Sequence, residues 1–167
     1  MSRLLAIDPG SSESGWVLID TGTCRPLEFG KDENAGLLDR LDWGRPEWDT
    51  AVIEMVASYG MAVGAEVFET CVWIGRFTEA IRRYRFDRAE PELVKRLAVK
   101  THLCHSAKAN DSNIRQALVD RFAPGQGNHG KGTKAAPGWF YGFHRDVWAA
   151  YALAVYAADQ LGEVGAA

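Results

Sequence analysis

The chain has 167 residues, of which 47% are hydrophobic, and a formal net charge of −3 at pH 7. This length suits one domain with a substantial core. No apolar run approaches the roughly 18 residues of a membrane span, which excludes a membrane-spanning protein. The first residues lack a basic segment followed by an apolar stretch, so we expect no secretory signal and a cytoplasmic location. Cys24, Cys71 and Cys104 match neither a disulfide framework nor a zinc pattern, and we expect reduced thiols.

Charge is unevenly distributed along the chain. Residues 76–108 hold nine basic and four acidic side chains, whereas residues 1–75 hold five basic and thirteen acidic ones. A polyanionic partner would meet this local excess rather than the net charge. The alternative is a solvated helix surface with ion pairs between successive turns. The basic block therefore predicts a nucleic-acid-binding face, with the solvated helix as the competing interpretation.

The first twenty residues predict two strands joined by a tight turn. Residues 4–7 are apolar and end on Asp8, a polar glycine-containing turn follows, and residues 16–19 are apolar again. Pro9 cannot donate to a sheet ladder, so the first strand stops there and leaves the Asp8 carboxylate at its end. That position suits a hard cation. It also suits a turn aspartate that caps its own backbone.

The middle of the chain continues this pattern. Residues 24–29 predict a third strand, and residues 30–48 predict a loop with a short helical turn. Residues 50–53 form an apolar run that ends on Glu54, so we expect a buried strand with a carboxylate at its end. A long helix is expected over residues 63–84, because Val67, Cys71, Ile74, Phe77 and Ile81 form one apolar stripe.

The remaining elements are mostly helical. A short fifth strand is expected near residues 84–86, and Pro91 is expected to open a helix that runs to about residue 99. Further helices are expected over residues 109–122 and 147–161, separated by a flexible basic loop over residues 124–138. This order predicts an α/β fold whose sheet is antiparallel at first and parallel later, with helices on its faces.

Acidic residues recur where these elements meet. Asp8 and Glu54 end strands that should lie side by side, and His144 and Asp146 stand at the start of the last helix. Carboxylates a few ångströms apart cannot all ionise without a cation, and oxygen ligands suit Mg²⁺ or Mn²⁺. Two such ions can activate water and stabilise a leaving oxygen, which is the chemistry of phosphodiester hydrolysis.

Several short motifs then define a resemblance. They are Ala6-Ile7-Asp8-Pro9-Gly10 with Gly15 and Trp16, Val52-Ile53-Glu54, Gly75-Arg76, Val99-Lys100 followed by Lys108, and Asp146-Val147-Trp148-Ala149-Ala150 with Ala152-Leu153-Ala154. In this order and spacing, from residue 3 to about 158, the chain resembles RuvC-like Holliday junction resolvases of the RNase H-like superfamily, of the kind found in phages. The resemblance implies a mixed five-stranded sheet flanked by helices and a single nuclease domain over residues 1–167.

The resemblance also implies a metal site. Asp8, Glu54 and Asp146 would hold two Mg²⁺ or Mn²⁺ ions. The family usually has a fourth ligand three positions before the final Asp, where this chain has Phe143. His144 therefore becomes the candidate fourth ligand or proton donor, and the alternative is a surface histidine at a helix start.

Basic residues near the scissile phosphate are implied as well. Lys100 and Lys108 match family positions of this kind, and one of them, with Lys108 assigned to the catalytic set, would stabilise charge in the transition state. The alternative is phosphate anchoring without catalysis. Arg76, Lys131 and Lys134 complete the expected DNA contacts, the last two from a loop that would otherwise be an inert surface segment.

Other positions depart from the family or stay open. The aromatic residue that wedges into the junction in cellular members is replaced by Ala57, so Tyr59 or Phe68 would stack on an unpaired base instead. Phe68 would otherwise serve core or dimer packing. Gly75 lies on the helix that forms the family's dimer, although that helix would alternatively pack only on the sheet. Asp111 is either a helix cap or a site residue.

These expectations combine into one function. We expect a homodimeric, metal-dependent endonuclease that cuts Holliday junctions and other branched DNA and leaves 5′-phosphate and 3′-hydroxyl ends. Loss of the wedge predicts cutting of a broader range of branches. The alternative is a non-catalytic branched-DNA-binding protein on the same fold. A nucleotide-binding relative that shares the first hairpin is disfavoured, because the chain lacks a second Asp-Gly phosphate loop.

Overall fold

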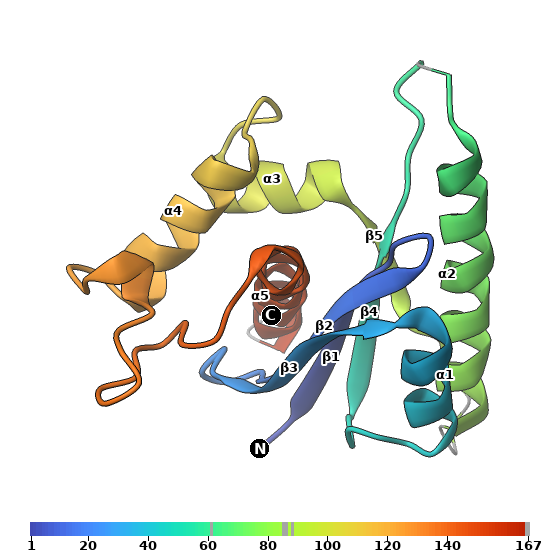
Figure 1. The fold of residues 1–167 in the computed structure, drawn as a ribbon, viewed down its shortest axis with the longest axis horizontal. Coiled ribbons are helices and arrows are strands. Elements are labelled where there is room, and N and C mark those ends of the chain that lie inside the picture. Colours follow the sequence, from blue (N-terminus) through green and yellow to red (C-terminus); the bar gives the residue numbers. More distant parts are fainter. Residues whose placement is uncertain (61, 85–86, 88, 166–167) are drawn as a thin grey trace.

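The computed structural model describes residues 1–60, 62–84, 87 and 89–165. Five strands form one mixed sheet in the order β3-β2-β1-β4-β5 (Figure 1). The strands are β1 (Arg3–Asp8), β2 (Glu13–Asp20), β3 (Pro26–Glu33), β4 (Thr50–Met55) and β5 (Glu92–Lys95). β1, β2 and β3 pair antiparallel, whereas β4 pairs parallel with β1 and with β5. The predicted change from antiparallel to parallel pairing is confirmed.

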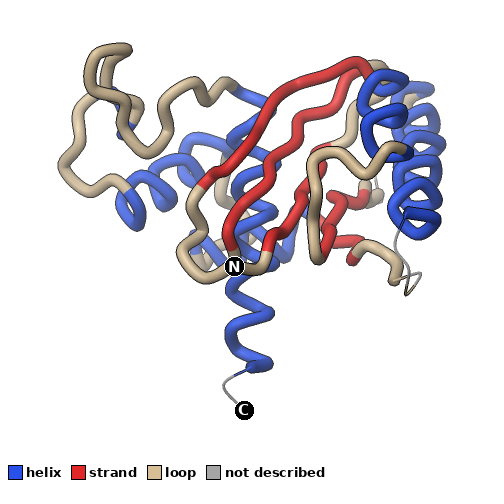
Figure 2. The backbone as a smooth tube through the Cα atoms, turned by 90° about the horizontal axis from the view of Figure 1, so that it is seen from below, coloured by secondary structure: helices blue, strands red, loops and turns tan. Residues whose placement is uncertain are grey.

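Helices cover both faces of this sheet. They are α1 (Asn34–Asp42), α2 (Ala65–Tyr84), α3 (Arg96–Cys104), α4 (Asp111–Phe122) and α5 (Arg145–Gly165), with a 3₁₀ turn, η1 (Asn128–Gly130). α1 and α2 lie on one face, and α5 lies on the other with α3 and α4 outside it (Figure 1). Figure 2 shows the twisted sheet between these layers and the end of α5 projecting beyond it.

Strand alternation divides the core into two clusters. Successive side chains of a strand point to opposite faces. In β1, Leu5 and Ile7 pack with α1 and α2, whereas Leu4 and Ala6 pack toward α5. In β4, Val52 faces the α5 side and Ile53 the α2 side. This alternation decides which face receives the side chain that follows each strand.

A small polar network fixes the turn after β1. The buried Ser14 hydroxyl donates to Asn34 Oδ1 at 2.6 Å, and Asn34 Nδ2 donates to the Gly10 carbonyl at 2.9 Å. The Gly10 amide donates to Ser14 Oγ at 3.3 Å. Because each polar group finds a partner within this turn, the end of β1 is held in place against the start of α1.

Three expectations about the elements differ from the structure. The segment 30–48, expected as a loop with one helical turn, contains the last part of β3 and all of α1. The helix expected from Pro91 to about residue 99 is instead β5 followed by α3. Pairing with β4 and burial of Val94 favour the strand, so tertiary context overrides a local helix signal. The fifth strand exists, but at 92–95: Tyr84 ends α2, and residues 85 and 86 lie outside the described residues.

Two simpler expectations concern the cysteines and the membrane. All three cysteines are free: Cys24 is buried, and Cys71 and Cys104 are partly buried. Within the described ranges, no helix combines the length and apolar character that crossing a bilayer requires.

Candidate active site

Three of the predicted carboxylates meet at the carboxyl-terminal edge of the sheet. Asp8 follows Ala6 by two residues, and Glu54 follows Val52 by two, so both side chains face α5. Ile7 pairs with Ile53 in the parallel ladder, which places Asp8 beside Glu54. Asp8 pairs with Gly15 in the antiparallel ladder. The sheet register alone therefore presents two carboxylates side by side to the start of α5.

Gly15 brings the third carboxylate to the same place. A Cβ atom at Gly15 would lie 2.9 Å from the Asp146 Cβ and 2.5 Å from the Asp146 carbonyl oxygen. Real side chains do not approach this closely, so only glycine lets the first turn of α5 rest on β2. Asp146 consequently lies over the row of residues that includes Asp8.

Asp8 stands in an unfavourable electrostatic setting. The pKa of its carboxyl group is raised from 3.8 to about 7, mainly by burial and then by the charge of Glu54, with smaller contributions of Asp146 and Asp111 and with the charge of Arg96 opposing them. In the described part of the chain, no side chain donates a hydrogen bond to this carboxylate or pairs with it directly. A carboxylate held among other carboxylates in this way ionises more readily when a cation lies near it.

Two protein cations hold the outer carboxylates. Arg96 Nη1 lies 3.1 Å from Glu54 Oε2, while Lys31 Nζ lies 3.2 Å from Asp146 Oδ2. Lys31 also lies 2.9 Å from Glu13 Oε2, and hydrogen bonds to Glu13 and Asp146 raise its pKa. Burial raises the pKa of Glu54, although Arg96 opposes that effect. The site therefore carries its own counter-charges on both sides of Asp8.

The donor set fits a hard divalent cation, but it is not closed around one. Carboxylate oxygens are the ligands that Mg²⁺ and Mn²⁺ prefer. Among the residues that the structure describes, no group of three or more His, Cys, Asp or Glu side chains is arranged to hold a metal ion together. Arg96 and Lys31 engage Glu54 and Asp146 instead. A metal ion held jointly by Asp8 and one of these carboxylates would compete with the corresponding ion pair.

Asp111 joins this site, whereas Phe143 does not. Asp111, at the first position of α4, forms an ion pair with Arg96, and that hydrogen bond lowers the pKa of Asp111. The helix cap is Asn110, whose side chain accepts a hydrogen bond from the Asn113 amide, so the cap interpretation of Asp111 is wrong. Phe143 is buried, with its ring 4.8 Å from that of Phe29.

A cleft of about 400 Å³ adjoins the carboxylates. Its lining residues are Arg96, Asp111, Ile114, Arg115, Lys131, His144, Arg145, Trp148 and Ala149. His144 is exposed there, and its carbonyl accepts hydrogen bonds from the first turn of α5. The structure thus puts His144 beside the carboxylate cluster, in a basic cleft, rather than among the carboxylates.

The other predicted DNA contacts are dispersed. Lys100 on α3 lies close enough to lower the pKa of Glu54 and of Asp111. Lys108 is exposed in the loop between α3 and α4, and Lys134 is exposed in the loop after α4. Arg76 is exposed on α2, 4.6 Å from the Trp73 ring centroid. Of this set, Lys100 and Lys131 lie nearest the carboxylate site.

The basic block of residues 76–108 does not form one face. Arg82 pairs with Glu79, and Arg83 pairs with Asp42 and Glu79, which is the solvated helix arrangement. Arg96, from the same block, points into the carboxylate site. Arg85 and Arg88 lie outside the described residues. The positive charges around the site come instead from separate segments, including Arg115 and Arg145, which the charge distribution did not single out.

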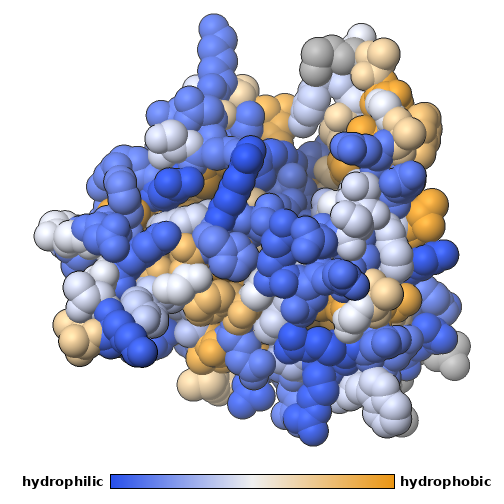
Figure 3. Space-filling view, viewed as in Figure 1, coloured by the Kyte–Doolittle hydropathy of each residue, from blue (hydrophilic) through white to orange (hydrophobic). Residues whose placement is uncertain are grey.

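The predicted apolar stripe of α2 is fully buried only in its second half, since Val67 and Cys71 are partly buried, and further apolar side chains outside the stripe are exposed. Ile74, Phe77 and Ile81 are buried against the sheet, whereas Phe68 is 62% exposed and Val72 is 55% exposed. Figure 3 shows hydrophobic side chains over the upper part of α2. Tyr59, in the loop before α2, is 60% exposed. These exposed apolar side chains are available to a partner.

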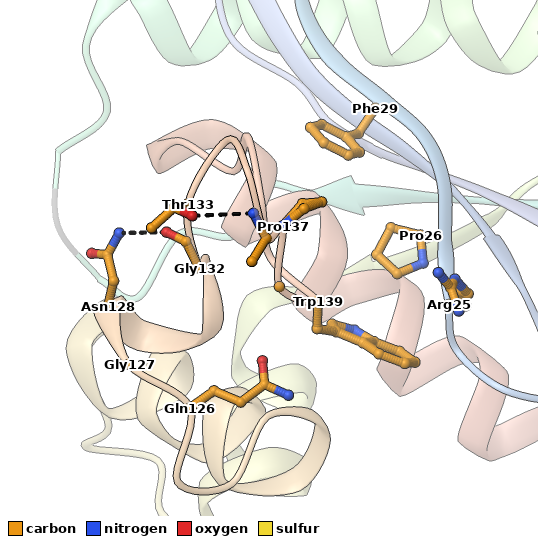
Figure 4. A pocket seen from close by; sticks show the side chains of 12 residues that line it. Arg25, Pro26, Phe29, Gln126, Gly127, Asn128, Gly132, Thr133, Pro137 and Trp139 are labelled. Atoms are coloured by element: carbon orange, nitrogen blue, oxygen red, sulfur yellow. Dashed lines mark hydrogen bonds between the residues drawn. The ribbon is translucent and has the colours of Figure 1, made fainter.

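A larger cavity, of about 760 Å³, lies between the β3 edge and the loop after α4 (Figure 4). Figure 4 shows the Trp139 ring on one side and Pro26 and Phe29 on the other. The loop, expected to be flexible, contains η1 and a β-bridge between Gly132 and Pro137. None of the predicted carboxylates lines this cavity.

Comparisons with known proteins identify the fold. No family model matches the chain, and no curated protein sequence matches it either. Among solved structures, it is similar to Thermus thermophilus RuvC in complex with a Holliday junction substrate, at a TM-score of 0.64 and 16% identity over 97% of each chain. A second Thermus thermophilus RuvC structure matches at a TM-score of 0.59 and 19% identity over 96% of each chain. The chain therefore has the fold of the RuvC Holliday junction resolvases, an RNase H-like fold.

Proposed function

We propose that this protein is a metal-dependent endonuclease that cleaves phosphodiester bonds in Holliday junctions and other branched DNA. The observation that carries the proposal is the convergence of Asp8, Glu54 and Asp146 at one edge of a RuvC-type sheet, next to a basic cleft. Carboxylate ligands for a cation and basic groups for phosphate are the two features that metal-dependent phosphodiester hydrolysis uses. The structural neighbour bound to a Holliday junction supports branched DNA as the substrate class.

Asp8, Glu54 and Asp146 would hold the metal, with His144 as a further ligand or proton donor. Mg²⁺ or Mn²⁺, two ions per site in this proposal, would supply activation of water and charge stabilisation at the departing 3′ oxygen. Arg96 would leave Glu54 as the site loads and would then be free for the DNA backbone. Lys100 and Lys108 would orient the phosphate, and one of them would stabilise the charge that develops on it.

A homodimer completes the proposal. A four-way junction offers two symmetric strands, and a two-fold dimer presents one carboxylate site to each. The exposed apolar part of α2, with Phe68 and Val72, supports this helix as the contact. Tyr59, which precedes it, would reach an unpaired base.

A non-catalytic branched-DNA-binding protein is the second candidate. The ion pairs of Arg96 with Glu54 and of Lys31 with Asp146 favour it, because they neutralise the carboxylates without metal. In that case the basic cleft would bind DNA and no bond would be cut.

Asp8→Asn separates the two candidates. On a four-way junction with Mg²⁺, we expect the wild type to cut and the variant to lose cleavage while its affinity for the junction, measured in EDTA, stays within about twofold. Full cleavage by Asp8→Asn would refute the metal mechanism. Equal, tight binding by both proteins without any cutting would support the second candidate.

A further inference from the structure

We propose that the 400 Å³ cleft beside the carboxylates is a phosphate pocket that binds one internal backbone phosphate of the DNA, neighbouring the phosphate that is cut. This inference rests on the proposed function and makes its DNA contact specific. The pocket is formed by Arg96, Arg115, Lys131, His144 and Arg145, together with the ring of Trp148.

The pocket has an excess of positive charge that the protein does not neutralise. Asp111 is its acidic residue; it forms an ion pair with Arg96 and also lies close enough to Arg145 for that charge to lower its pKa, so one carboxylate faces several cations. Over the described ranges, no ion pair involves Arg115, Lys131 or Arg145. Three cations from α4, the loop after it and the start of α5 therefore converge on one cleft, and an anion would relieve their mutual repulsion.

Arg115 is a partly buried arginine that lines the cleft and has no carboxylate partner in the described part of the chain. Its Nε atom is buried and has no hydrogen-bond partner. Its guanidinium lies 5.6 Å from the centroid of the Trp148 ring, which holds its plane in position. A buried donor without an acceptor is rare in folded proteins. A planar guanidinium offers two parallel donors that match two phosphate oxygens.

The position of the pocket identifies the phosphate. Arg96 lines the cleft and also bonds Glu54, and Arg145 directly precedes Asp146. The pocket and the carboxylates thus share a wall. The start of the 21-residue α5 adds the positive end of a helix dipole to the same place. A strand whose phosphate is cut at the carboxylates would bring a neighbouring phosphate here, whereas a terminal 5′-phosphate exists only after cutting.

A neutral-phosphate scan tests this inference. Four-way junctions with a single methylphosphonate at each position around the cleavage site are bound, in EDTA, to the wild type, Arg115→Gln and Lys131→Gln. For the wild type, we expect one position next to the cleavage site to weaken binding about tenfold. Arg115→Gln should bind the normal junction about tenfold more weakly, should lose nothing further at that position, and should show a salt dependence shallower by about one charge.

Controls keep the outcomes distinct. Arg45→Gln changes an exposed arginine in the loop before β4, at the opposite end of that strand from Glu54, and should behave as wild type. Because Arg115 packs on Trp148, the Arg115→Gln variant could fail to fold. Lys131→Gln is therefore a second variant of the pocket, at a loop position that does not make this packing contact. Equal methylphosphonate losses in wild type and both variants, with junction cleavage intact, would overturn the pocket alone. Failure of the wild type to bind junctions would overturn the proposed function as well.

The ligand source is tested separately. Inorganic phosphate and a nicked junction with a 5′-phosphate at the nick serve as competitors of the intact junction. We expect both to compete weakly and equally against wild type and Arg115→Gln. Competition by either that requires Arg115 would show that the pocket binds a terminal or free phosphate, which contradicts the internal phosphate proposed here.

Discussion

The Asp8 carboxylate is the residue in which fold and chemistry conflict most. Burial and the neighbouring carboxylates raise its pKa to about 7, so its ionisation opposes folding. A carboxyl group whose pKa is higher in the folded state destabilises the fold as pH rises from its unfolded value toward the folded one. The isosteric amide removes that effect without changing the packing.

We therefore expect Asp8→Asn to stabilise the metal-free protein at pH 8 by about 1–3 kcal/mol, an increase in Tm of several degrees. The gain should shrink as the pH falls from about 7 and vanish well below 3.8, where Asp8 is protonated in both states. Mg²⁺ should stabilise the wild type and not the variant. Thermal melts in EDTA and in Mg²⁺ measure both effects, with the exposed Asp39→Asn as control. A lower Tm for Asp8→Asn in EDTA at pH 8 would contradict this account.

Arg96 competes with metal for the same carboxylates. Its guanidinium lies 3.1 Å from Glu54 and also binds Asp111. Arg96→Gln removes this competing charge, so we expect Mn²⁺ affinity of the free protein to rise about tenfold, measured by titration calorimetry. Arg96→Lys should keep the weak affinity, and the distant Arg45→Gln should leave it unchanged. Unaltered Mn²⁺ affinity in Arg96→Gln would show that the ion pair does not guard the site.

The position of a site residue could be predicted from sequence where the residue ends an apolar strand. Asp8 and Glu54 follow apolar runs, and the sequence could place them at strand ends. Lys31 could not be found in this way, because its contact with Asp146 depends on the pairing of Lys31 with Gly15. The contact of Arg96 with Glu54 could not be predicted, because the strand before Arg96 was expected to be a helix. Arg96 stands two residues after Val94, just past the end of β5, and so continues the face of that strand that points to Glu54.

At the scale of elements, one carboxylate connects three helices. Asp159 on α5 accepts two hydrogen bonds from Arg121 on α4, at 2.7 and 2.8 Å, and lies 2.7 Å from His102 Nε2 on α3. Burial would raise the pKa of Asp159, but these hydrogen bonds outweigh it, and the pKa is lowered. Its contribution to stability is therefore present at neutral pH and is lost as pH falls through the folded-state pKa.

Asp159→Asn should accordingly destabilise the protein by about 1–3 kcal/mol at pH 7, measured by urea denaturation. The difference from wild type should shrink as the pH is lowered into the acidic range where Asp159 itself becomes protonated. Asp120→Asn, which changes an exposed carboxylate on α4 that accepts from Gln116, is the matched control and should stay near wild type. Equal stability of Asp159→Asn and wild type would show that the contacts of Asp159 with Arg121 and His102 do not stabilise the fold.

Element prediction succeeded where burial and local pattern agree. β1, β2, β4 and α5 are long apolar segments, and their existence followed from periodicity. The error at residues 91–99 arose because a four-residue strand is too short to show a period, and only its pairing with β4 identifies it. The α2 stripe was correctly helical, but its periodicity could not tell that its first half has no sheet to pack on.

At the scale of the whole molecule, α2 separates core from surface. Its second half closes one core cluster, and its first half exposes Phe68 and Val72. The proposed dimer would cover these side chains. We expect Val72→Glu to convert a dimer to a monomer, measured by light scattering. Its Tm should fall only by the stabilisation that dimerisation provides, because Val72 is not part of the core. Glu69→Gln, on an exposed position of the same helix, should leave the dimer intact. A monomeric wild type would contradict the dimer.

The global arrangement was largely accessible from sequence, since the order of the elements and their apolar faces define the mixed sheet. The charge pattern was less informative, because residues adjacent in sequence diverge in space. Arg83 reaches Asp42 at the end of α1, whereas Arg96 reaches Glu54 at the site. The basic cleft is formed by side chains that lie far apart in the chain, so only the fold brings them together.

Cleavage of a defined substrate tests the central claim most directly. A labelled immobile four-way junction and a linear duplex of the same sequence are incubated with the protein in Mg²⁺ or EDTA. We expect paired, symmetric nicks with 5′-phosphate and 3′-hydroxyl ends on the junction, dependent on Mg²⁺, and none on the duplex. Stable binding of the junction without nicks, in Mn²⁺ as well as Mg²⁺, would contradict this expectation and would leave a branched-DNA-binding protein whose carboxylates are neutralised by Arg96 and Lys31.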